Sequence, residues 1–102
     1  MGGFIYLIKD DMGLKIGSSK EGCINNRIKS VMRNRGTGTC RLVGVSKEYS
    51  NYLNAERWIR DFATIKYNLP IHINEWHNFK DKDSITEELL KNLLKLLNSY
   101  VE

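Results

Sequence analysis

Residues 4–17, with the sequence FIYLIKDDMGLKIG, decide the fold of this chain. Residues 4–9 are apolar, β-branched and aromatic, which predicts a strand. Residues 10–13 (DDMG) have turn composition, and residues 14–17 (LKIG) predict a second short strand. Gly13 suits a turn position with positive φ, because glycine has no Cβ to clash there. The stretch therefore predicts a β-hairpin.

Beyond this hairpin, hydrophobic periodicity predicts three helices and one further strand. The helices are expected over residues 24–35, 51–66 and 85–100, the strand over 40–45, and an irregular or strand-like stretch over 71–79. Ser84 and Glu87 form an S-x-x-E capping box that predicts the start of the last helix. This order is typical of an α+β fold, here a small antiparallel three-stranded sheet flanked by helices, with an added leucine-rich helix at the C-terminal end.

Length and composition set the domain organisation. With 102 residues, a single domain is expected, in which a core over residues 1–79 carries the helix of residues 80–102 packed on it. No apolar run is long enough to span a membrane, and the N-terminus lacks the pattern of a secretory signal. Cys23 and Cys40 have neither disulfide-framework nor zinc spacing, so reduced thiols are expected. We expect a cytoplasmic protein with no membrane partner.

Positive charge is concentrated in the first part of the chain. The formal net charge is +4, but residues 1–73 carry +6 and residues 74–102 carry −2. The densest basic stretch holds one acidic residue, Glu21, and the cations Lys15, Lys20, Arg27, Lys29, Arg33, Arg35 and Arg41. Such a stretch can bind phosphates, but it is also typical of a solvated face. Charge alone leaves both interpretations open.

Glu56 has an unusual place in the second helix. It lies in the apolar stripe formed by Tyr52, Ile59 and Ala63. A carboxylate on an apolar face is costly unless it is paired or bound to a metal ion. Arg60, four residues further on, offers an ion pair on the same helix. Periodicity therefore leaves a structural pair and a metal site equally open for Glu56.

Arg27 shares a helix face with Ile24, Ile28 and Val31, so its guanidinium is expected near the core side. The alternative is a stem that lies over the core with its head in water. An inward arginine, an inward glutamate and a hairpin tyrosine could converge on one site. One carboxylate plus waters is a normal Mg²⁺ arrangement, and an arginine fork fits a phosphate.

The hairpin resembles a known family. Residues 4–6 (FIY) and 15–17 (KIG) resemble the paired GIY and YIG tripeptides of the GIY-YIG nucleases, with Phe4 in place of the first glycine and Lys15 in place of the second tyrosine. This spelling is similar to a branch of short viral and bacterial members of that superfamily. The resemblance implies that the FIY and KIG strands pair and carry part of an active site.

Three later segments extend the resemblance over residues 3–79. Arg27 falls where the family keeps a helix-borne arginine, although Val31 stands where a histidine often follows. Glu56 resembles the metal-binding glutamate of the next helix, and residues 74–79 (NEWHNF) resemble the closing segment. The resemblance therefore implies a GIY-YIG-like nuclease core.

The resemblance implies a metal-dependent endonuclease that hydrolyses phosphodiester bonds in DNA with Mg²⁺ or Mn²⁺. Glu56 would anchor the ion, and Tyr6 would activate or position the attacking water. Lys15 would contact a phosphate or water, and Arg27 would neutralise charge on the non-bridging oxygens. Gly17 would allow a close approach, although a strand-end glycine explains it equally well.

The surrounding residues follow from the same resemblance and from the charge pattern. Nucleic-acid contacts, mainly to phosphates, are expected from Gly17, Lys20, Lys29, Arg33, Arg35 and Arg41. Asn74 and His77 would support the site. The C-terminal leucine stripe is expected in the core or as a dimer or partner face, so the oligomeric state stays open. The alternative is a catalytically silent GIY-YIG-like module that binds nucleic acid or a partner protein. The expected location is the cytoplasm of a bacterial or virus-infected cell.

Overall fold

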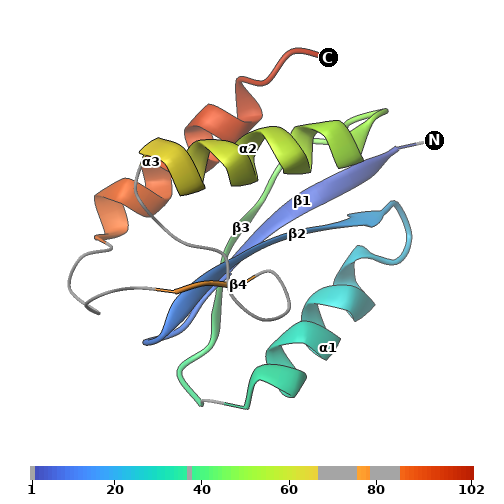
Figure 1. The fold of residues 1–102 in the computed structure, drawn as a ribbon. Coiled ribbons are helices and arrows are strands. Elements are labelled where there is room, and N and C mark those ends of the chain that lie inside the picture. The colour runs from blue at the N-terminus through green and yellow to red at the C-terminus, as the bar shows by residue number, and fades with distance from the viewer. Residues whose placement is uncertain (1, 37, 67–75, 79–85) are drawn as a thin grey trace.

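The computed structural model describes residues 2–36, 38–66, 76–78 and 86–102. The elements are β1 (Gly3–Lys9), β2 (Gly13–Lys20), α1 (Ile24–Arg35), β3 (Arg41–Val45), α2 (Tyr52–Lys66), β4 (Trp76–Asn78) and α3 (Glu87–Asn98). They form an α+β unit with one antiparallel sheet of strand order β3-β1-β2-β4 (Figure 1). The helix α1 covers one face of the sheet, and α2 and α3 lie on the other.

The sheet has four strands, so the expectation of three is wrong. The additional strand is β4, which pairs with β2 from Gly13 to Lys15. A strand of three residues is too short to show a clear alternation, so periodicity gives little signal for it. The remainder of the stretch 71–79 lies outside the described residues.

Strand alternation divides the buried residues into two clusters. On the side of α2 and α3, the core contains Ile5, Leu7, Leu14 and Ile16 together with Ala55, Ile59, Ala63, Leu90, Leu93 and Leu97. On the side of α1, a smaller cluster contains Tyr6, Ile8, Ile28, Val31 and Trp76. The α3 leucines at these positions are therefore core residues. No helix among the described ranges is long and apolar enough to cross a membrane.

The start of α3 differs from the expected capping box. Thr86 is the N-cap, and its hydroxyl accepts a hydrogen bond from the backbone N–H of Leu89 at 3.1 Å. Ser84 lies outside the described residues. Glu87 contributes negative charge to the first turn, where it favours the helix dipole.

The β1–β2 turn is organised by the side chain of Asp10. Its carboxylate accepts hydrogen bonds from the backbone N–H groups of Met12 and Gly13, both at 2.8 Å. Gly13 does not have a positive φ, contrary to expectation, since the positive-φ glycines of the described ranges are at 22, 36 and 38. Glycine is needed at position 13 because there is no room for a side chain: a Cβ there would lie 2.7 Å from the carbonyl oxygen of His77 in β4.

The same carboxylate fastens the turn to the end of α1. Arg35 Nε donates to Asp10 Oδ2 at 2.5 Å, and the Arg35 guanidinium lies 4.0 Å from the centre of the Trp76 ring. The buried carboxylate of Asp10 therefore joins the turn to α1, and the guanidinium of Arg35 joins α1 to β4. Although burial opposes it, hydrogen bonding from Arg35, Met12 and Gly13 lowers the pKa of Asp10.

This lowered pKa predicts an acid-sensitive contribution to stability. A carboxyl group with a lowered folded-state pKa stabilises fully above its unfolded pKa of about 3.9, and the stabilisation is lost as pH falls through the folded pKa. Asp10→Asn is expected to lower the free energy of unfolding by about 1–3 kcal/mol at pH 7, with the difference shrinking below about pH 4. Thermal unfolding at a series of pH values measures it. Asp11→Asn, in the exposed part of the same turn, is the matched control, and an equal pH profile for both variants would contradict the assignment.

Candidate functional site

Tyr6 and Gly17 are direct partners across β1 and β2, and their contact defines the centre of the site. A Cβ at Gly17 would lie 2.4 Å from the Tyr6 hydroxyl oxygen and 2.5 Å from its Cζ. The ring of Tyr6, which is fully buried, therefore crosses β2 over this glycine. The close approach expected at Gly17 is made by the protein's own phenol, and the absent side chain lets the hydroxyl reach across β2.

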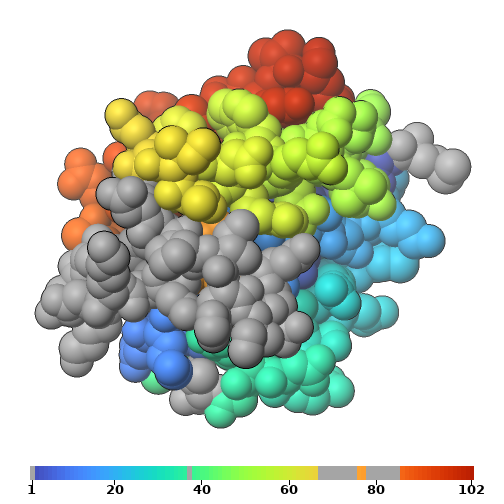
Figure 2. Space-filling model, in the orientation of Figure 1, coloured from blue at the N-terminus to red at the C-terminus, as the bar shows by residue number. Residues whose placement is uncertain are grey.

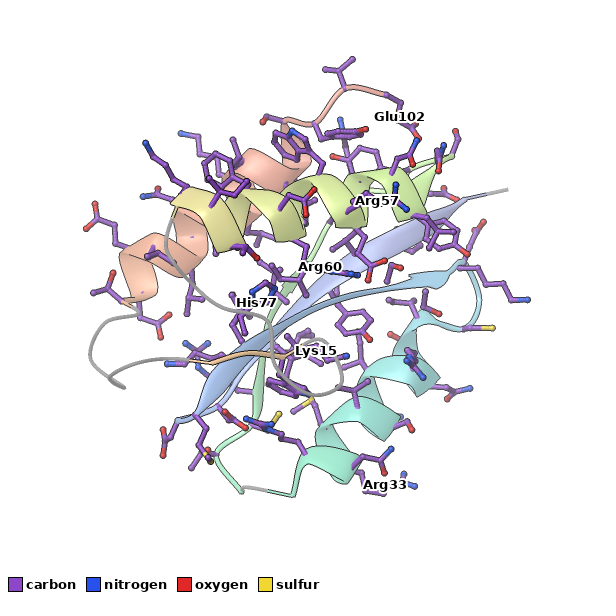
Figure 3. The ribbon with its side chains drawn as sticks, in the orientation of Figure 1. Lys15, Arg33, Arg57, Arg60, His77 and Glu102 are labelled. Carbon is purple, nitrogen blue, oxygen red and sulfur yellow. The ribbon has the colours of Figure 1, made fainter. Side chains whose placement is uncertain are left out.

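The carboxylate of Glu56 makes two contacts, and one of them is with the residue of β2 that follows Gly17. The Ser18 hydroxyl donates a hydrogen bond to Glu56 Oε2 at 3.0 Å, and Arg60 Nη2 forms an ion pair with Glu56 Oε1 at 2.7 Å. Glu56 is only 8% exposed, so its carboxylate is nearly enclosed. Figure 3 shows Arg60 extending from α2 toward β2. The ion pair that periodicity left open for Glu56 is therefore formed.

The two groups approach β2 from opposite sides of the sheet. Gly17 faces α1 with Tyr6, whereas Ser18, the next residue, faces α2. Gly17 and Ser18 lie beyond the part of β2 that pairs with β4, because that pairing ends at Lys15. Figure 2 shows the end of β2 and the turn after it at the surface between α2 and α1. The Tyr6 hydroxyl and the Glu56 carboxylate therefore reach consecutive residues of one strand.

Lys15 and Arg27 are the other two residues expected to be catalytic, and one is buried while the other is exposed. Lys15 is 6% exposed and lies opposite Ile8 of β1, so it shares the α1 face with Tyr6. Arg27 is exposed on the first half of α1, which agrees with the alternative in which its head lies in water rather than with an inward position. It lies next to the buried Ile28, at the border of the buried face. Tyr6 and Lys15 thus lie on the α1 face of the sheet, Glu56 comes from the α2 face, and Arg27 is exposed on α1.

The predicted nucleic-acid-binding residues also differ among themselves. Lys20, Lys29 and Arg33 are exposed, and Figure 3 shows Arg33 pointing outward from α1. Arg35 is half-buried in the contact with the turn, and Arg41 forms an ion pair with a glutamate of α3. Arg35 and Arg41 thus have protein partners with which a phosphate would compete. The basic surface that remains most accessible is α1 with the end of β2.

The two supporting residues expected from the closing segment have different outcomes. His77 lies in β4 opposite Leu14 and is fully buried, so its side chain is on the α2 face. Asn74 lies outside the described residues. Sequence reasoning missed Ser18, although a signal exists. Leu14, Ile16 and Ser18 alternate along β2, so a hydroxyl replaces an apolar side chain on the core face.

The side chains of the site can be compared with the ligands that a divalent ion requires. Within the described ranges there is no group of three or more histidine, cysteine, aspartate or glutamate side chains that could hold a metal. Glu56 and Ser18 supply a carboxylate and a hydroxyl, which are the oxygen ligands that Mg²⁺ accepts alongside water. The Arg60 guanidinium beside the same carboxylate opposes a second cation. The residues fit a single-carboxylate site provided that Arg60 moves.

Comparison of the chain with protein-family models, curated proteins and solved structures gave no match. The resemblance to the GIY-YIG nucleases therefore depends on residues 4–6 and 15–17, with Arg27 and Glu56. Function has to be argued from the site itself.

Proposed function

We propose that this chain is a metal-dependent endonuclease of the GIY-YIG type that hydrolyses phosphodiester bonds in DNA. The observation that carries the proposal is that the Tyr6 hydroxyl and the Glu56 carboxylate reach consecutive residues of β2. A fully buried phenol packed over a glycine and a nearly enclosed carboxylate thus meet at adjacent residues of one strand. A site where a water molecule and a phosphate are oriented gives both groups a use.

Tyr6 is the residue that orients the attacking water in this proposal. A phenol is a weak base near neutral pH, so its main contribution is a hydrogen bond that fixes the water in line with the phosphorus. Because the ring is fully buried and crosses Gly17, its hydroxyl has little positional freedom. Lys15, on the same face of the sheet, adds positive charge where the phosphate becomes more negative.

Glu56 holds the divalent ion, with the Ser18 hydroxyl keeping the carboxylate oriented. Mg²⁺ or Mn²⁺ bound there would act as a Lewis acid on the phosphate oxygens. Arg27 contacts a non-bridging phosphate oxygen, since its exposed side chain is long enough to reach the phosphate of a bound strand. Lys20, Lys29 and Arg33 hold flanking phosphates, which makes the affinity for DNA fall as salt rises. In this proposal the site residues carry out the hydrolysis, and the basic surface binds the DNA.

A catalytically silent nucleic-acid-binding module is the second candidate, and one observation favours it. Both carboxylate oxygens of Glu56 already have protein partners, Ser18 and Arg60, so the carboxylate is satisfied without a metal. In this case the exposed basic residues of α1 would still bind phosphates. Binding would depend on salt but not on a divalent ion.

Incubation of the purified chain with plasmid, single-stranded and branched DNA separates the two candidates. With Mg²⁺ or Mn²⁺, the nuclease is expected to cut at least one of these substrates, and EDTA is expected to stop it. An RNA strand of matching sequence tests whether cleavage requires deoxyribose. Salt-sensitive binding without cleavage of any substrate would contradict the nuclease and support the silent module.

A further inference from the structure

Arg60 occupies the position beside Glu56 that a metal ion would need. Its Nη2 lies 2.7 Å from Oε1, while Ser18 takes Oε2, so both oxygens of the carboxylate are engaged. The side chain of Arg60 is 20% exposed and that of Glu56 is 11% exposed, so the pair is poorly screened by solvent. This geometry makes the ion pair more than a surface contact along a helix.

We propose that Arg60 is an internal counter-ion that must leave Glu56 before a divalent ion binds, so that metal binding is an exchange of one cation for another. A metal ion coordinates a carboxylate oxygen at about 2.1 Å. A guanidinium paired with the same oxygen would then lie within a few ångström of a dication. Repulsion at that distance in a poorly solvated site disfavours double occupancy. This inference rests on the proposed metal site at Glu56.

The pair with Arg60 also gives the Glu56 carboxylate a charge partner when no metal ion is bound. An unpaired carboxylate on the face of α2 that contacts the core would be costly, and Arg60 removes that cost in the metal-free protein. The displaced guanidinium has solvent to move into, because a fifth of its side chain is already exposed. Arg60 is therefore a positioning residue that lowers metal affinity while stabilising the empty site.

Mn²⁺ titration of the full chain, with free Mn²⁺ followed by electron paramagnetic resonance, tests the exchange directly. Arg60→Met is expected to bind Mn²⁺ about tenfold more tightly than the wild type, because the competing charge is gone. Arg60→Lys keeps a cation and is expected to stay near the wild type. Arg57→Met removes the same charge from an exposed position of α2 (Figure 3) and is the matched control, with little change expected.

Thermal unfolding gives a second, independent measurement on the same variants. In EDTA, Arg60→Met is expected to melt below the wild type, and saturating Mn²⁺ is expected to raise its melting temperature more than that of the wild type. If Arg60→Met does not fold, Arg60→Gln, which is neutral and carries a polar amide, replaces it in both measurements.

Equal or weaker Mn²⁺ binding in the neutral variants would overturn the exchange, as would the absence of Mn²⁺ binding in every variant. Equal or weaker binding in the neutral variants leaves the nuclease proposal to the cleavage assay and its response to EDTA, whereas absence of Mn²⁺ binding in every variant also counts against the metal site at Glu56. Conversely, tighter Mn²⁺ binding by Arg60→Met would support the exchange even if no DNA substrate were cut. The two proposals can therefore fail separately.

Discussion

Glu56→Gln is expected to lower DNA cleavage by about 100-fold or more while leaving DNA binding nearly unchanged. The substitution keeps the shape of the side chain but removes the charge that holds the divalent ion. Loss of a partner that only orients a metal ligand already costs about 10–100-fold, so loss of the ligand should cost more. The exposed cations of α1 do not touch Glu56, so they should still bind phosphates. Cleavage rate and DNA affinity are measured on the same preparation in Mg²⁺.

The stability of this variant is a separate readout. Removing an unpaired charge from an apolar helix face would hold or raise stability, because such a charge is costly to bury. Because Arg60 pairs with Glu56, we instead expect a loss of about 1 kcal/mol, since the guanidinium keeps a weaker, neutral partner. Glu88→Gln, on the exposed side of α3, is the control for the change in net charge. Full cleavage activity in Glu56→Gln would remove Glu56 from the catalytic site.

The backbone elements could largely be predicted because local sequence determines them. The alternation over residues 4–9 and 14–17 and the stripe of Ile28 and Val31 correspond to β1, β2 and α1. The sequence predicts an irregular or strand-like stretch over residues 71–79, but not that residues 76–78 pair with β2 as a fourth strand. Sheet order is a long-range property, and a short edge strand leaves almost no trace in local composition.

The site shows where reasoning from periodicity reaches its limit. It correctly assigned Glu56 to a buried helix face, because a glutamate within an apolar stripe is visible in the sequence. For Arg27 it left an inward guanidinium and a solvated head both open, and the side chain at the border of the stripe is exposed. Contacts between distant segments, such as Ser18 with Glu56, depend on how the helix sits on the sheet. No local pattern contains that information.

Gly17→Ala is expected to impair both folding and cleavage through Tyr6. The new methyl group would lie 2.4 Å from the Tyr6 hydroxyl oxygen, 2.5 Å from Cζ and 2.8 Å from Cε2, so the ring has to move. The ring is packed with Ile8, Ile28 and Trp76 and cannot rotate away without disturbing them. We expect a loss of about 1–3 kcal/mol in the free energy of unfolding. Urea unfolding and the cleavage assay measure the two effects.

A second glycine provides the control for overpacking. At Gly44 in β3, a new Cβ would lie 2.6 Å from Leu94 Cδ2, which is the end of a flexible, half-buried side chain. Leu94 can change rotamer, so Gly44→Ala is expected to cost less than Gly17→Ala and to leave cleavage intact. A larger effect at Gly44 would contradict the idea that the rigid phenol, rather than crowding in general, makes Gly17 irreplaceable.

Tyr6→Phe separates the packing of the ring from the chemistry of its hydroxyl. Phenylalanine keeps the ring over Gly17, so the change in stability should be small beside that of Gly17→Ala. Cleavage should nevertheless fall by about 100-fold, a typical contribution of one positioned proton-transfer or orienting group. If Gly17→Ala lost stability but Tyr6→Phe cut DNA at the wild-type rate, the glycine would serve packing alone. The attacking water would then have to be oriented by another group at the edge of β2.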